Sequence, residues 1–384
     1  MNRDIARLGT TIFETMSGLA RDLGAINLGQ GFPDGPGPAP LLEAAARALI
    51  EKSSQYPPMR GLPELRAAVA GYYAAHQRLD IAPEEVVITS GATEALAAAL
   101  LALLDPGDEV ILFQPLYDAY APLVRRAGGV PRLVNLIPPH WRLPLDSIED
   151  QLGLRTRMLV LNSPHNPTGS LIDAEEWHFL GDLCERHDLL LLCDEVWEAM
   201  LFGEGAHRSP LAMAALRERA VKIGSAGKIF SLTGWKVGWA CAAPPLAEAI
   251  GKMHQYLTFT TPPALQWAVA EGLALPPAWH AGHRRLHAAG RSRLAEGLAR
   301  AGYAVQEGPA TWFLLVDLTQ SGIAMDDSTF CERLVREASV AAIPLSAFYE
   351  RDAETRYVRF CFTKAPEVLD EAIGRLAAFR SALG

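Results

Sequence analysis

Short apolar runs alternate with longer amphipathic stretches through the middle of the chain. The apolar runs predict strands at residues 85–89, 109–113, 131–135, 157–162, 189–194, 220–225 and 237–243. The stretches between them predict helices that include residues 93–104, 117–128 and 174–187. Continuously apolar strands separated by helices are typical of a mostly parallel sheet that helices cover on both faces. The pattern therefore predicts an α/β fold around a sheet of these strands.

The pattern changes character from Trp279 onward. An Arg-rich helical stretch at 283–302 precedes strand-like residues 313–318, a helix at 327–338 and a strand at 357–362. This mixture predicts a smaller α+β domain. We expect an N-terminal segment (1–30) that packs with this small domain, a large domain (31–275) and the small C-terminal domain (276–384).

Composition and charge narrow the classes of function. The 384 residues carry a net charge of −9, so no basic field favours nucleic acid or anionic membranes. Apolar runs stay below the roughly 18 residues that a membrane span needs. The five cysteines are scattered without a CxxC pair, which indicates buried thiols in a reducing compartment rather than disulfides or a metal site. The first residues lack the apolar core of a signal peptide, and we expect a cytoplasmic protein.

Two motifs each place a turn, made of small residues or flanked by proline, directly after a predicted strand. In residues 88–96 (ITSGATEAL) a strand ends at Thr89 and a helix begins near Thr93. Exposed N–H groups at such a helix start form a phosphate cradle, although an ordinary strand-turn-helix capped by Thr93 has the same pattern. Residues 162–169 (NSPHNPTG) place Asn166 on a proline-flanked turn, where its amide is able to bind a ligand oxygen.

Two further motifs place charges at strand ends. Residues 189–198 (LLLLCDEVWE) put Asp194 and Glu195 after a fully apolar strand. A charge there is costly unless a cation such as a protonated pyridine nitrogen meets it, and the alternative is a solvated acid or a helix cap. Residues 224–239 place Lys228 in a Ser/Gly-rich turn. A lysine beside a ligand is able to lose its proton and attack carbonyl groups, whereas most lysines in turns are only solvated.

In this order the four motifs resemble those of the class I and II aminotransferases of pyridoxal-phosphate (PLP) fold type I. The likeness covers almost the whole chain and also includes residues 26–38, 55–70, 113–122 and 358–369. Within the family the chain looks most like bacterial methionine aminotransferases and kynurenine/glutamine transaminases, on residues 252–266 and 338–349. The resemblance implies a large domain with a mostly parallel seven-stranded sheet, plus a smaller α+β domain.

The resemblance also implies the reaction and the residues around the cofactor ring. Such enzymes move the amino group of an L-amino acid to a 2-oxo acid in two half-reactions. Lys228 matches the lysine that holds PLP as a Schiff base and then moves a proton between the substrate Cα and the cofactor. Asp194 matches the acid that keeps the pyridine nitrogen protonated. Asn166 matches the donor to the phenolic oxygen, and Tyr117 matches the aromatic ring that stacks on the cofactor.

The cofactor phosphate is assigned by the same resemblance. The backbone N–H groups of Ala92 and Thr93 would hold it, with the hydroxyl of Ser225 and the ammonium of Lys236. Tyr56 matches a tyrosine that reaches the phosphate bound in the neighbouring subunit. The resemblance thus implies a homodimer with shared active sites.

The substrate site is assigned less fully. Arg359 matches the arginine that grips the substrate α-carboxylate with two prongs, with the Gly31 backbone and Asn166 beside it. Tyr256 and Phe259 lie in a segment that, in relatives, helps to wall the partner's pocket. No second arginine for a distal carboxylate is evident, so we expect a neutral, apolar or aromatic donor of the methionine, glutamine, phenylalanine or kynurenine type.

Two positions depart from the common family pattern. Trp197 stands where most relatives have a tyrosine, and an indole N–H is able to donate a hydrogen bond but does not ionise. Lys236 stands where many relatives have arginine, and an ammonium neutralises phosphate without two-pronged geometry. We interpret His165 and His254 as structural residues.

Two rival functions remain open at this point. A cysteine-S-conjugate β-lyase would use the same Lys228 but release pyruvate and ammonia without a keto-acid acceptor. A non-catalytic PLP-binding regulator is the other alternative. The presence of Lys228, Asp194 and Arg359 and the lack of a basic patch argue against it.

Overall fold

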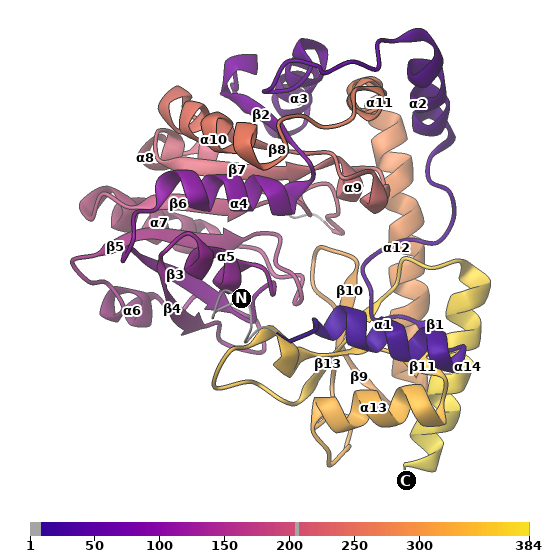
Figure 1. Ribbon diagram of the computed structural model, residues 1–384. Coiled ribbons are helices and arrows are strands. Elements are labelled where there is room, and N and C mark those ends of the chain that lie inside the picture. Colours follow the sequence, from indigo (N-terminus) through magenta and orange to yellow (C-terminus); the bar gives the residue numbers. More distant parts are fainter. Residues whose placement is uncertain (1–8, 204–206, 384) are drawn as a thin grey trace.

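A seven-stranded sheet forms the centre of one half of the molecule (Figure 1). The structure, a computed structural model, describes residues 9–203 and 207–383. The sheet has the order β2-β8-β7-β6-β5-β3-β4. Its strands are β2 (Val86–Thr89), β3 (Glu109–Gln114), β4 (Val130–Asn135), β5 (Thr156–Asn162), β6 (Leu190–Asp194), β7 (Ala220–Ser225) and β8 (Gly238–Ala242). Strand β8 runs antiparallel to β2 and β7, and the other neighbours are parallel. The prediction of a mostly parallel seven-stranded sheet is confirmed.

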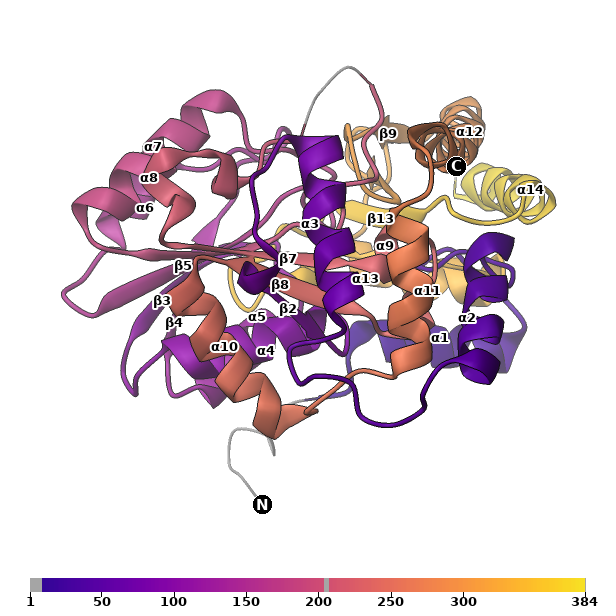
Figure 2. The same cartoon turned by 90° about the horizontal axis from the view of Figure 1, so that it is seen from above.

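Helices cover both faces of this sheet, which explains its apolar strands. Every residue of β2, β3, β6, β7 and β8 is buried. Figure 2 shows α7 and α8 on one face and α4 and α10 on the other. The helices of this region are α2 (Ala39–Glu51), α3 (Pro63–Gln77), α4 (Ala92–Leu103), α5 (Tyr120–Arg126), α6 (Leu145–Asp150), α7 (Ala174–Arg186), α8 (Ala214–Arg217), α9 (Ala226–Ile229), α10 (Pro244–Leu257) and α11 (Pro263–Leu273). Short 3₁₀ helices lie at Pro83–Glu85, Pro210–Ala212 and Thr233–Trp235.

A second, antiparallel sheet lies in the other half of the molecule. It has the order β12-β13-β10-β9. Its strands are β9 (Ala304–Gln306), β10 (Phe313–Asp317), β12 (Ile343–Pro344) and β13 (Tyr357–Cys361). Its helices are the long α12 (Pro277–Arg300), α13 (Asp327–Glu337) and α14 (Pro366–Ala382), with a 3₁₀ turn at Leu345–Phe348.

The N-terminal segment packs against this second half. Strand β1 (Ile26–Asn27) pairs in parallel with β11 (Val340–Ala341), and α1 (Ile12–Leu23) lies beside α13 (Figure 1). The α1 helix begins at the side-chain cap of Thr11 and ends at Gly24 in the left-handed conformation (φ 60°). No helix among residues 9–203 and 207–383 is both long and apolar enough to cross a membrane.

One predicted helix begins later than expected. The helical pattern began at residue 117, whereas α5 begins at Tyr120. Pro122 explains the difference, because it lacks an N–H and its ring would clash with the carbonyl of Asp118 in a helix interior. Proline is tolerated in a first turn, so the helix starts two residues before it. The segment that carries Tyr117 is therefore left outside the helix, at the end of β3.

Candidate active site

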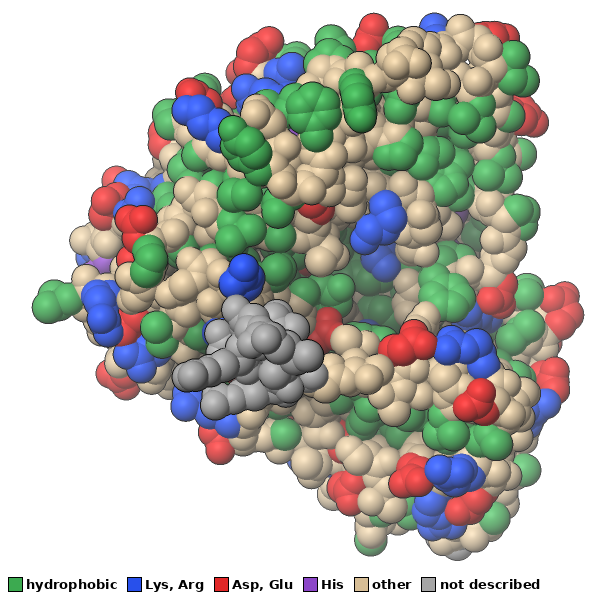
Figure 3. All heavy atoms as spheres, viewed as in Figure 1, with side chains coloured by type: hydrophobic (Ala, Val, Ile, Leu, Met, Phe, Trp, Pro, Cys, Tyr) green, Lys and Arg blue, Asp and Glu red, His purple; other side chains and the backbone are tan. Residues whose placement is uncertain are grey.

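A cavity of about 980 Å³ opens at the carboxyl ends of the central strands, between the two halves of the molecule. Figure 3 shows the surface hollowed there. In an open α/β sheet this edge is where ligands bind. Eleven residues predicted for the site line it: Gly31, Ala92, Thr93, Tyr117, Asn166, Asp194, Trp197, Ser225, Lys228, Lys236 and Arg359.

The N-terminus of α4 forms one wall of the cavity. The first N–H groups of a helix lack intrahelical partners, and no side chain caps α4. Gly91 precedes the helix with φ 81°, and a Cβ there would lie 3.1 Å from Cε and 3.2 Å from Nζ of Lys236. Only glycine combines this conformation with so close an approach. The ammonium of Lys236 thus lies next to the helix start that carries the N–H groups of Ala92 and Thr93, an arrangement that suits an anion.

Asp194 lies buried at the end of β6, without a lysine or arginine in a salt bridge among the described residues. The hydroxyl of Tyr120 donates to its Oδ2 at 2.7 Å, and the N–H of Val196 donates to Oδ1 at 3.3 Å. Burial raises the pKa of this carboxyl to about 6. A buried carboxylate in this state is stabilised by a cation. Sequence reasoning missed Tyr120, because its position in YDAY gives no sign of which tyrosine points at the acid.

Lys228 lies on the short helix α9 directly after β7. Its Nζ donates to the carbonyl of Gly31 at 3.1 Å and lies 4.5 Å from the ring centre of Trp197 and 5.0 Å from that of Trp312. Burial lowers the pKa of the amine to about 8. About a tenth of the amine is therefore uncharged at pH 7, far more than for an exposed lysine, and a nucleophile or base requires this form.

The Gly31 position brings the chain close to the opposite half of the molecule. A Cβ on Gly31 would lie 2.6 Å from Cζ of Phe313, so a side chain there would displace this ring. Trp197 packs edge-on against both Trp312 and Phe313, with ring centres 4.9 and 5.3 Å apart. Trp197 therefore presents the face of its ring to Lys228 within the described contacts.

Arg359 reaches the cavity from the middle of β13. Its Nη1 donates to Oδ1 of Asn166 at 2.8 Å and its Nη2 to the carbonyl of Gly29 at 2.5 Å, while Nε has no partner among the described residues. The guanidinium is buried and 3.9 Å from the ring centre of Phe313. Burial lowers its pKa to about 9. No carboxylate of the described chain forms an ion pair with Arg359, so it is available for an anionic ligand.

Glu195 faces the opposite way from Asp194 and belongs to a closed cluster. Lys222 Nζ lies 2.5 Å from Oε2 of Glu195 and also contacts Glu198, and all three side chains are fully buried. His207 contacts Glu195 as well. Ligand atoms of the two acids and His207 lie within 4.8 Å of one another, close enough to hold a metal ion. The ammonium of Lys222 occupies the position between the carboxylates that a cation would take.

The other singled-out histidines have their partners within the chain. His165 contacts the hydroxyl of Thr168 at 2.7 Å and the carbonyl of Pro115 at 2.9 Å. His254 contacts Glu94 at 2.9 Å and the carbonyl of Met59 at 3.0 Å. Each ring thus joins segments that are distant in sequence.

Three predicted residues lie outside the cavity in the single chain. Tyr56 and Tyr256 are 82% and 79% exposed, and Phe259 is 41% exposed. Tyr56 and Phe259 pack edge-on with ring centres 5.5 Å apart. Tyr56 and Phe259 thus form an exposed aromatic patch.

The chain has relatives of known family. The pattern of the family described as "Aminotransferase class I and II" matches residues 24–376. The chain is 42% identical to a probable N-succinyldiaminopimelate aminotransferase of Mycobacterium tuberculosis, over 96% of each chain. It is 39% identical to the methionine aminotransferase of Escherichia coli, over 97% of this chain and 96% of the relative.

Solved structures agree with these matches. A structure from Escherichia coli with methionine aminotransferase function superposes with a TM-score of 0.95 at 38% identity, covering 98% of this chain and 99% of that one. The N-succinyldiaminopimelate aminotransferase of Mycobacterium tuberculosis superposes with a TM-score of 0.94 at 41% identity, over 98% and 99% of the chains. A lysine with a lowered pKa, an unpaired buried acid and an anion cradle in one cavity agree with these likenesses, and the chain belongs to the class I and II aminotransferases.

Proposed function

We propose that this aminotransferase takes the amino group from a neutral L-amino acid, of the methionine, glutamine, phenylalanine or kynurenine type, and gives it to a 2-oxo acid. The observation that carries the proposal is the charge of the cavity wall. Its lysines and arginines are Lys228, Lys236 and Arg359. Each has a task in binding the cofactor or the α-carboxylate, which leaves no cation of the described chain for a second carboxylate of the substrate.

The residues present fit PLP, the cofactor of this family. The helix start at Ala92 and Thr93, with Ser225 and Lys236, would hold the phosphate. Asp194 has the raised pKa of a buried acid that lacks a cation, and a protonated pyridine nitrogen would supply one. When bound, PLP supplies an electron sink for the electron pair left on the substrate Cα.

Several side chains would orient the cofactor and the reacting groups. Oδ1 of Asn166 accepts a hydrogen bond from Arg359. Its Nδ2 would therefore be able to donate to the phenolic oxygen of the cofactor. Tyr117 lies in the cavity wall beside the ring position. The uncharged amine of Lys228 would accept the proton of the substrate Cα and pass it to the cofactor carbon that carries the amino group.

Arg359 would bind the substrate α-carboxylate. Its buried guanidinium has no ion-pair partner among the described residues, so a carboxylate meets a cation that is already desolvated. The hydrogen bonds to Gly29 and Asn166 fix the plane of the guanidinium. The carboxylate and the reacting Cα are thereby held in one orientation relative to Lys228.

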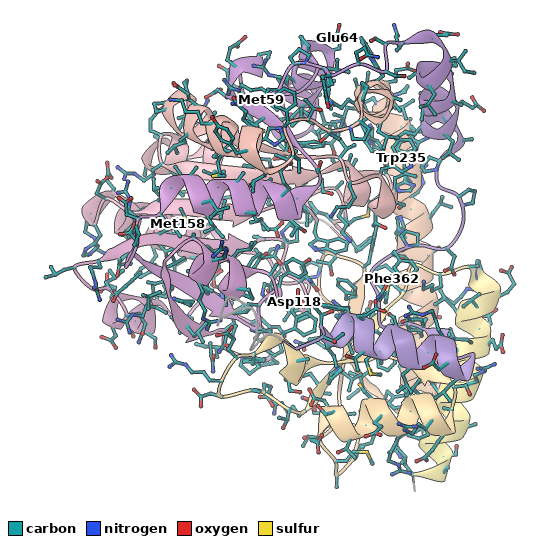
Figure 4. All side chains as sticks on the ribbon, in the orientation of Figure 1. Met59, Glu64, Asp118, Met158, Trp235 and Phe362 are labelled. Atoms are coloured by element: carbon teal, nitrogen blue, oxygen red, sulfur yellow. The ribbon has the colours of Figure 1, made fainter. Side chains whose placement is uncertain are left out.

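The cavity wall also contains acidic and apolar side chains. Glu14 and Glu350 line it but are paired with Arg21 and Arg125. Asp118 also lines it and lies between the two halves of the molecule (Figure 4). Burial raises the pKa of Asp118. A substrate with additional carboxylates, such as N-succinyldiaminopimelate, would meet no lysine or arginine of the cavity wall beyond Lys228, Lys236 and Arg359. Phe13, Phe32, Phe313 and Phe348 also line the cavity and suit an apolar or aromatic side chain.

We also propose that the working unit is a homodimer with shared sites. Tyr56 and Phe259 form an exposed aromatic patch, and Tyr256 is exposed as well. Aromatic residues are enriched at the cores of protein interfaces. Burial of this patch against a second copy would bring Tyr56 towards the partner's phosphate site. Light scattering on the purified protein tests the association.

The first experiment is the visible spectrum of the PLP-loaded protein. L-Methionine without an acceptor is expected to remove the band of the lysine-bound cofactor, and a 2-oxo acid is expected to restore it. In turnover assays, kcat/KM for L-methionine is expected to exceed that for N-succinyl-diaminopimelate by about 100-fold or more. The reverse order would contradict the proposed substrate class, and release of pyruvate and ammonia from S-conjugates without an acceptor would indicate a β-lyase.

A further inference from the structure

A second hollow, of about 780 Å³, lies between residues 33–40 and helix α12. It is separate from the active-site cavity. Ser231 in its wall follows helix α9, which carries Lys228, so the two sites are close along the chain. The wall includes Ser231, His283 and His287. The two histidines are spaced i, i+4 on α12, so they lie on one face of the helix.

The polar atoms of these three residues converge. Nε2 of His283 and Nε2 of His287 are 3.4 Å apart. The hydroxyl of Ser231 lies 2.9 Å from the first and 3.0 Å from the second. Three potential ligand atoms thus surround one point at the wall of the hollow.

Aromatic packing holds both rings in place. Trp279 stacks on His283 with ring centres 5.2 Å apart and an interplanar angle of 11°. Trp312 lies against His287 at 5.4 Å and 31°. The two imidazoles themselves are perpendicular, at 89°. Burial lowers the pKa of His283 to about 4 and that of His287 to about 3, so both rings are neutral at pH 7.

We propose that His283 and His287 bind a divalent transition-metal ion of the Zn²⁺ type through their Nε2 atoms, with the Ser231 hydroxyl facing a third coordination position. Zn–N bonds are roughly 2.0–2.1 Å long. With these bonds, the 3.4 Å separation of the nitrogens corresponds to an N–Zn–N angle of about 110°, close to tetrahedral. Imidazole is a favoured ligand of zinc and copper, and the hollow leaves room for water to complete the coordination.

The site lies close to the reacting lysine. Ser231 follows α9, which carries Lys228, and holds a left-handed backbone conformation at φ 59°. Helix α9 ends beside the first turns of α12 (Figure 1). Trp312 contacts His287 on one side and lies 5.0 Å from Nζ of Lys228. A bound ion would therefore fix the backbone and the aromatic ring that surround Lys228.

Zinc binding to PLP-loaded protein, freed of affinity tag and stripped of metals by a chelator, tests the proposal. Equilibrium dialysis against ZnCl₂ with elemental analysis is expected to give about one ion per chain. His283→Ala and His287→Ala are each expected to weaken binding by about tenfold or more. His280→Ala is the matched control, because His280 lies on the same helix and packs against Tyr72 and His76 instead. It is expected to leave the affinity within about twofold.

A second measurement avoids substitutions that disturb folding. The electron paramagnetic resonance spectrum of the wild-type protein with one equivalent of Cu²⁺ is expected to show coupling to two imidazole nitrogens. Absence of zinc binding, affinity unchanged in His283→Ala and His287→Ala, or a loss confined to His280→Ala would overturn the proposal. A copper spectrum with a single coupled nitrogen would overturn it too.

Discussion

Two lysines from neighbouring positions in the chain have opposite surroundings. Lys222, inside β7, is fully buried between the carboxylates of Glu195 and Glu198, and these raise its pKa. Lys228, just after the same strand, is also buried, but burial dominates and lowers its pKa to about 8. The same side chain is thus an inert part of the core in one place and a reactive amine in the other.

The contrast extends to the acids that follow β6. Glu195 is paired with Lys222, and its pKa is lowered, whereas Asp194 next to it is unpaired, and its pKa is raised to about 6. Alternation along a strand sends these adjacent side chains to opposite faces of the sheet. Buried charges satisfied within the chain stabilise the fold, and buried charges left without a partner indicate where a ligand binds.

The largest expected effect is the loss of activity in Lys228→Ala. Removal of the amine removes the base for the substrate Cα, and transamination is expected to fall by about 10⁴-fold or more. The thermal midpoint of the cofactor-free protein is expected to change little, because Lys228 forms no ion pair with the described residues. Single-turnover kinetics and calorimetry measure the two effects. Turnover at the wild-type rate would refute the assigned role.

The reverse pattern is expected for Lys222→Met. This change leaves two carboxylates buried without a cation, which costs about 3–5 kcal/mol of unfolding free energy. Urea unfolding measures the loss. The triple variant Lys222→Met/Glu195→Gln/Glu198→Gln removes all three charges and is expected to recover much of the stability. A single variant as stable as wild type would show that the cluster is not the stabilising unit described.

Asp194 makes the contrast dependent on pH. Its folded-state pKa of about 6 lies above the ordinary value of 3.8, so the folded, cofactor-free protein binds a proton more tightly than the unfolded chain. The stability that this proton provides is present below about pH 4 and is lost as pH rises through 6. Relative to Asp194→Asn, wild type is expected to lose about 3 kcal/mol between these limits. Urea titrations at several pH values test this, and saturation with PLP is expected to abolish the difference.

The sequence was most informative where a physical requirement acts on every residue of an element. Strands buried on both faces must be apolar throughout, so β3 and β6 were located within a residue or two. The direction of a strand does not change its apolar pattern, so the sequence did not predict that β8 is antiparallel. Helix periodicity likewise did not register the proline that shortens α5.

Within the site, the sequence located residues that end strands and missed those that act through contacts. Lys228 and Asp194 follow apolar runs, where a charge is conspicuous. The imidazole pair of His283 and His287 lay unnoticed in an Arg-rich helix, although its i, i+4 spacing is a usable signal. The exposed Tyr56 shows no role within one chain, because the site it is expected to serve belongs to a second copy.

Substitution of Tyr120 is expected to have the smallest effect, and it tests the contrast between Asp194 and Glu195 most specifically. Its hydroxyl donates to Oδ2 of Asp194 at 2.7 Å and thereby favours the charged carboxylate, as Lys222 does far more strongly for Glu195. Tyr120→Phe removes one hydrogen bond to a charged group, worth about 1.5 kcal/mol, and is expected to weaken PLP binding and kcat by about tenfold. The pKa of Asp194 is expected to rise, which NMR of the cofactor-free protein measures.

Tyr117→Phe keeps the ring and is the matched control, because Tyr117 does not donate to the acid within the described contacts. If Tyr120→Phe left the Asp194 pKa unchanged, desolvation alone would set the charge of this acid, and the hydrogen bond would not contribute to the difference between the two carboxylates.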